Sequence, residues 1–193
     1  MQPIAPLMIE HRLIERMVSL MRQDLDRIRS NIAIDPEFAF VDPVFIDVAV
    51  DFLRTYADRC HHGKEEDILF VELVKKELPP DLKKIMDELT QEHKRAREFT
   101  KELVKAKENY LREEPEAVSK VLFYLDKLTA MYPKHINKED QHFFISCMAY
   151  FTPEEKEAML ARMWEFDRQM IHDKYQGVVS AIENRQACGL EHK

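Results

Sequence analysis

The apolar residues of this chain recur at alternating steps of three and four along five long segments, a period that is typical of helices packed on a core. Prolines and caps separate these segments, whose expected bounds are residues 4–30, 43–77, 81–112, 115–149 and 152–183. Short connections between long helices favour antiparallel neighbours. The pattern therefore predicts an all-α fold, an up-down-up-down four-helix bundle with an additional C-terminal helix.

The length of 193 residues fits a single domain. We expect residues 1–150 to form the bundle and residues 151–193 to form a C-terminal helix and tail packed on the same domain. The start of this last helix is marked by a capping box, in which Thr152 precedes Glu155 by three residues.

Composition excludes several classes of function. Only 3 residues are glycine, which argues against all-β folds and against glycine-rich phosphate loops. The formal net charge of −7 disfavours nucleic acid and anionic membranes as partners. No uncharged run approaches the ~20 residues that cross a bilayer, and no secretory signal is visible, so we expect a cytoplasmic protein without membrane contact. The 3 cysteines are widely spaced and suggest no disulfide framework.

Each of the four helices expected in the bundle carries a histidine on its core-facing stripe, namely His11, His61, His93 and His135. Two of these histidines are followed four residues later by a carboxylate, Glu65 and Glu139, which lies on the same face one turn along. Burying an unpaired carboxylate costs several kcal/mol or forces it to take up a proton. Four imidazoles and two carboxylates in one core therefore predict a bound cation.

The pattern repeats within the chain. The decapeptides HHGKEEDILF (61–70) and HINKEDQHFF (135–144) share His, Lys, Glu and Phe at matching places, and a Glu-His-basic triplet precedes each, at Glu10 and at Glu92. Each half thus offers two imidazoles and one carboxylate, a set that leaves coordination positions open on non-haem iron. Two halves imply two metal ions, and these ligand types suit Fe, Mn or Zn better than Cu(I).

The arrangement EH…HHxxEExxxF…EH…HxxxED resembles the hemerythrin-like (HHE cation-binding) proteins, and the resemblance covers about residues 7–150. It implies a metal-binding four-helix bundle around a non-haem di-iron centre with two iron ions. It also implies a small diatomic ligand or peroxide as the binding partner: dioxygen, nitric oxide or peroxide, bound for sensing, scavenging or iron and oxygen handling. The iron ligands implied by the resemblance are His11, His61, Glu65, His93, His135 and Glu139.

The chain departs from the oxygen-carrying hemerythrins at one position, because Arg97 stands where they have a second histidine one turn after the ligand of the third helix. The sequence leaves open whether Asp140 replaces Glu139 as a ligand, and whether His62, Glu66, His142 or His172 join the site. The stripe that contains His62 passes through Thr55 and Arg59, which favours a position outside the ligand set.

Three functions are compatible with these observations. The preferred one is a non-catalytic di-iron protein that binds dioxygen or a similar small ligand. The second is a di-iron oxidase or a peroxidase-like detoxifying enzyme, since Arg97 in place of an imidazole leaves positions for turnover. The third is a structural or regulatory bundle that a metal such as zinc holds together.

Overall fold

The computed structural model describes residues 2–190, with side chains described through Met170 and at Lys174. Within this range the chain is helical and has no strand, which confirms the all-α prediction. The elements are α1 (Ile4–Ile34), η1 (Pro36–Phe38), α2 (Pro43–Phe52), η2 (Leu53–His62), η3 (Glu65–Phe70), α3 (Val71–Leu73), α4 (Pro80–Leu111), α5 (Ala117–Lys138), η4 (Glu139–Phe143), α6 (Phe144–Cys147), η5 (Met148–Tyr150) and α7 (Pro153–Leu190).

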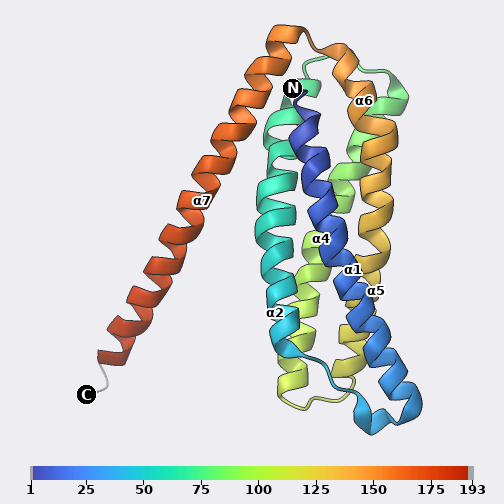
Figure 1. The fold of residues 1–193 in the computed structure, drawn as a ribbon, viewed down its shortest axis with the longest axis vertical. Coiled ribbons are helices and arrows are strands. Elements are labelled where there is room, and N and C mark those ends of the chain that lie inside the picture. Colours follow the sequence, from blue (N-terminus) through green and yellow to red (C-terminus); the bar gives the residue numbers. More distant parts are fainter. Residues whose placement is uncertain (1, 191–193) are drawn as a thin grey trace.

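Four long rods form the bundle (Figure 1). The first rod is α1, the second runs from α2 through α3, the third is α4, and the fourth runs from α5 through η5. The rods α1 and α4 each pack against α5, and α2 packs against both α1 and α4, so the four enclose a common core. The buried stripe of α1 includes Leu7, His11, Ile14, Val18, Met21, Leu25 and Ile28, and every one of these residues was expected to face the core.

Side-chain caps explain where two of the helices, α2 and α7, begin. Asp42 accepts hydrogen bonds from the backbone N–H groups of Val44 and Phe45 at the start of α2, with Pro43 as the first helical residue. Before α7, the N–H of Thr152 donates to the Glu155 carboxylate at 2.9 Å, and the N–H of Glu155 donates to Thr152 Oγ1 at 3.2 Å. This reciprocal pair is the capping box expected from the sequence.

The second and fourth rods are not regular α-helices at the level of the histidines. Their segments η2, η3 and η4 are π-helical, with hydrogen bonds from residue i to residue i+5. A π-helical turn holds more residues than an α-helical one, so a side chain beside the 3.6-residue stripe can also face the core, as His62 does next to His61. The sequence did not predict these turns.

The helix α7 lies outside the four-rod bundle and contacts it at η2 and η3 (Figure 1). Its first half contributes Met159, Leu160 and Met163 to the buried set, and its axis then leads away from the bundle. Residues 191–193 of the expected tail lie outside the described residues. Each helix within residues 2–190 is too short or too polar to cross a membrane.

Candidate metal centre

All six predicted ligands lie in the bundle core, at the level where η2 ends and η3 and η4 begin. His11 comes from α1, His61 from η2, Glu65 from η3, His93 from α4, His135 from α5 and Glu139 from η4, and each is at most 3% exposed. A seventh side chain, His62 from η2, lies with them and is 1% exposed. The structure thus brings together every residue of the predicted set and adds a fifth imidazole.

These side chains form two groups whose donor atoms lie within 4.8 Å of one another. The His11 cluster consists of His11, His61, Glu65 and Glu139. The His93 cluster consists of His62, Glu65, His93 and His135. Glu65 belongs to both, which makes it the structural link between the two groups.

The two carboxylates face both clusters. Glu65 has Oε1 3.4 Å from His61 Nε2 and Oε2 3.4 Å from His93 Nε2. Glu139 has Oε2 3.1 Å from His11 Nε2 and Oε1 3.2 Å from His135 Nε2. Since a carboxylate has two oxygens, each of these residues could bridge two ions.

All five imidazoles are oriented by a carboxylate on their outer nitrogen. Each Nδ1–H group donates a hydrogen bond to one carboxylate. The pairs are His11 with Asp140 (2.8 Å), His61 with Glu10 (2.9 Å), His62 with Asp58 (3.3 Å), His93 with Glu66 (2.7 Å) and His135 with Glu92 (2.8 Å). With the proton on Nδ1, each Nε2 is left as a lone-pair acceptor that points inward. Carboxylate–histidine pairs of this kind orient metal ligands in proteins.

When all five rings are neutral, the inward-facing atoms are therefore all acceptors. Within the described residues, seven buried atoms at this site have no hydrogen-bond partner, namely Nε2 of His62, His93 and His135 and both carboxylate oxygens of Glu65 and Glu139. His11 Nε2 and His61 Nε2 face each other at 2.9 Å, a separation that two lone pairs tolerate only with a proton or a cation between them. Metal bonds of ~2.1 Å at right angles place neighbouring donors ~3 Å apart, which matches these distances.

The pKa values of the site histidines diverge in the metal-free core: those of His11 and His93 are raised, and those of His61 and His62 are lowered. Burial lowers the pKa of His61 to about 4, and burial together with His93 lowers the pKa of His62 well below its usual range. Burial and the nearby Glu139 raise the pKa of Glu65 well above its usual range. For His11, burial opposes protonation, but hydrogen bonds to Asp140 and Glu139 outweigh it and raise the pKa to about 9. The metal-free core therefore favours protons on some of its donors, and a metal cation would take their place.

The sequence repeat has a structural explanation in the contacts around the imidazoles. In each half, the lysine of the decapeptide and its first histidine bond to the glutamate of the preceding triplet: Lys64 and His61 to Glu10, and Lys138 and His135 to Glu92. The acid at the sixth place crosses to the other half, so that Glu66 bonds His93 and Asp140 bonds His11. The two hairpins therefore brace each other's ligands.

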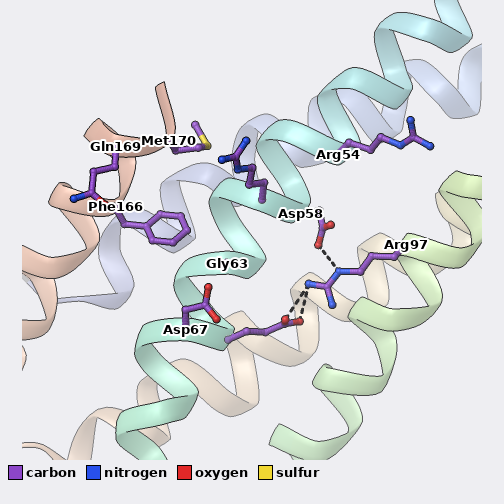
Figure 2. Close-up of a pocket in the computed structure, with 10 residues that line it drawn as sticks. Arg54, Asp58, Gly63, Asp67, Arg97, Phe166, Gln169 and Met170 are labelled. Atoms are coloured by element: carbon purple, nitrogen blue, oxygen red, sulfur yellow. Dashed lines mark hydrogen bonds and ion pairs between the residues drawn. The ribbon is translucent and has the colours of Figure 1, made fainter. Parts of the chain in front are cut away.

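His62 breaks this symmetry, because its counterpart in the second decapeptide is Ile136. Its outer partner Asp58 accepts a hydrogen bond from Arg97 Nε at 2.8 Å, and Arg97 also donates to both oxygens of Glu66 at 2.9 Å. Arg97 thus holds the carboxylates behind His62 and behind His93 (Figure 2). The fifth imidazole thus comes from η2. Arg97, at the position where the resemblance implies a second histidine, instead holds the carboxylate that orients His62.

The residues that the sequence left open fall into distinct places. Asp140 and Glu66 are outer carboxylates, with Asp140 bonded to His11 and to Arg12. His142 is exposed and does not join the site. The side chain of His172 lies outside the described residues. Sequence reasoning missed Glu10, Glu92 and Asp58 as partners of the histidines, although the repeated Glu-His pairs were a signal for the first two.

A third group of possible ligands, Glu10, Cys60 and Asp167, lies beside the His11 cluster. The ammonium group of the fully buried Lys64 bonds both Glu10 and Asp167 and already supplies the cation there. Burial raises the pKa of Cys60 to about 12, so its thiol stays protonated. This group is an ion-pair network rather than a further metal site.

The fold and site define a four-helix bundle with a buried cation-binding centre. A family model described as the hemerythrin HHE cation-binding domain matches residues 2–146, and the chain belongs to this family. The match ends before α7. Comparison with curated proteins and with solved structures found no match.

Proposed function

We propose that this protein holds two iron ions, one in each cluster, and binds dioxygen or a related small ligand such as nitric oxide or peroxide. The observation that carries the proposal is the convergence of buried imidazoles and carboxylates from four rods in two adjacent clusters, with seven of their inward-facing atoms unpartnered among the described residues. A set of imidazole and carboxylate donors without thiolate suits Fe, Mn or Zn. Iron is favoured over zinc because binding of dioxygen needs a redox-active ion, and Zn²⁺ has no redox chemistry.

The ligand set proposed here is the sequence-based set with His62 added. His11 and His61 would hold one ion, and His62, His93 and His135 the other, with Glu65 and Glu139 shared between them. This asymmetry gives the ion at the His11 cluster fewer protein donors, so an octahedral ion there keeps positions for an exogenous ligand. We therefore assign ligand binding to the His11 side.

The surroundings of the His11 cluster favour a small and uncharged ligand. His11 stacks on Phe144 with ring centroids 5.6 Å apart, and Phe143, Phe144 and Cys147 are fully buried beside the site. An apolar wall of this kind excludes water and offers no partner to a charged substrate. Binding without turnover is the preferred activity, and oxidase or peroxidase turnover is the alternative that the test below separates from it.

The test is an absorption spectrum combined with a turnover assay. Protein is loaded with Fe²⁺ in the absence of oxygen. When one sample is exposed to air, a ligand-to-metal charge-transfer band should appear. When nitric oxide is added to a second sample that is kept reduced, its absorption spectrum should also change. Peroxide should not be consumed catalytically. Sustained peroxide consumption would favour the enzyme alternative, and the absence of any spectral response from iron-loaded protein would contradict the proposal.

A further inference from the structure

A chain of three hydrogen bonds leads from α7 to an imidazole of the His11 cluster. Asp167 of α7 accepts from the Lys64 ammonium at 2.7 Å, and Lys64 also donates to Glu10 of α1. The other oxygen of Glu10 accepts from His61 Nδ1 at 2.9 Å. Lys64 is fully buried in this chain, so its charge depends on these two carboxylates.

Two further contacts fix α7 at the same place. The thiol of Cys60 donates to Asp167 Oδ1 at 3.3 Å. Phe166 points from α7 toward Gly63, where a Cβ atom would lie only 2.8 Å from its ring (Figure 2). Residues 60–64 thus form one of the contacts that dock α7, and the same short stretch supplies His61 and His62.

The second half of the repeat offers an internal comparison. There Lys138 bonds Glu92, which orients His135, and the second acceptor for Lys138 is Glu88 of α4 at 2.9 Å. Glu88 belongs to the same hairpin, so this network is complete within the bundle. The network around Lys64 is completed from outside the bundle, by a helix beyond the residues that match the family.

We propose that Asp167 is a positioning residue for the metal centre and that docking of α7 and metal binding stabilise each other. This inference rests on the proposed function, because it requires an ion held by His61. Docked α7 fixes Lys64, Lys64 fixes Glu10, and Glu10 holds the ring of His61 with Nε2 inward. Linkage is reciprocal, so an ion that needs His61 in this orientation must favour docked α7 by the same factor.

The experiment compares the full-length wild type with Asp167→Ala and with the matched control Arg162→Ala. Arg162 is also on α7 and donates to Glu72 of the second rod at 2.6 Å, an exposed ion pair that leads to no proposed ligand. Zn²⁺ affinity is measured by competition with a chelating dye, and amide hydrogen exchange of residues 156–170 is measured with and without Zn²⁺. Asp167→Asn serves as a milder variant if the alanine variant does not fold.

We expect Asp167→Ala to weaken Zn²⁺ binding about tenfold, the lower end of the range seen when outer partners of metal ligands are removed. Arg162→Ala should stay within twofold of the wild type. Zn²⁺ should slow exchange in residues 156–170 of the wild type by a similar factor, and this protection should be lost in Asp167→Ala. Equal affinities for the two variants, or metal-independent exchange in α7, would overturn the inference while leaving the metal site intact. Failure of the wild type to bind Zn²⁺ would contradict the metal site itself.

Discussion

The imidazole rings of His62 and His93 stack with their centroids 3.9 Å apart and their planes 14° from parallel, although they come from different rods. Both rings present Nε2 to the same cluster, and neither Nε2 has a hydrogen-bond partner in the described structure. Two rings in this arrangement form one face of the candidate cation site.

The first prediction concerns the fifth imidazole. Replacing His62 by Ala removes one donor from the His93 cluster and leaves the His11 cluster unchanged, so one of the two ions should bind more weakly and the metal content should fall below about two ions per chain. Elemental analysis after dialysis against metal-free buffer measures this change. The control is His142→Ala, which removes an exposed histidine and should retain the wild-type content. Unchanged metal content in His62→Ala would show that His62 is not a ligand.

The second prediction concerns Arg97. Lysine cannot reproduce the planar contacts that Arg97 makes with Asp58 and Glu66, so Arg97→Lys should weaken binding of one ion by about tenfold. A competition titration that resolves two binding steps would show the loss in one step. Arg95→Lys, on the exposed side of the same helix, is the matched control. Equal weakening of both steps would argue against a role confined to the His93 cluster.

The third prediction concerns the shared carboxylate. Glu65→Gln removes the carboxylate that belongs to both clusters. Its negative charge is unfavourable in the buried metal-free core, and we expect metal binding to require it. In the wild type, metal at a hundred times its Kd should raise the free energy of unfolding by ~2.7 kcal/mol per site. The variant should show no such gain, while its metal-free form should be at least as stable as the metal-free wild type. Chemical denaturation with and without chelator measures both quantities, and a wild-type metal gain in the variant would refute the assignment.

The fourth prediction concerns the contact between Gly63 and Phe166. A Cβ atom at position 63 would lie 2.8 Å from the ring of Phe166, so Gly63→Ala should destabilise the protein by ~1 kcal/mol despite the better helix propensity of alanine. In a Phe166→Ala background the clash is absent, and the same substitution should stabilise the protein by up to ~1 kcal/mol. Thermal unfolding of the four proteins in this cycle gives the coupling. Additive effects would show that α7 does not pack there in solution.

Periodicity predicted the bundle and the buried positions of His11 and His93 because both lie on regular α-helices, where a stripe of 3.6 residues per turn is also a face. The same rule placed His62 outside the ligand set, and the structure shows its ring buried beside the predicted ligands, in the π-helical segment η2. The roles of Glu10 and Glu92 depend on contacts between rods, which spacing along one helix does not reveal. The internal repeat could not reveal the role of Asp167, because Asp167 belongs to α7, which lies outside the two repeated halves.

The proposed pairing of Glu65 and Glu139 with two ions is tested most directly by metal stoichiometry. Protein purified without added metal is analysed for all transition metals and for protein concentration on the same sample. We expect about two ions per chain, with iron as the main metal. A protein that contains no bound metal, and whose unfolding is unaffected by added Fe²⁺ or by chelator, would contradict this expectation.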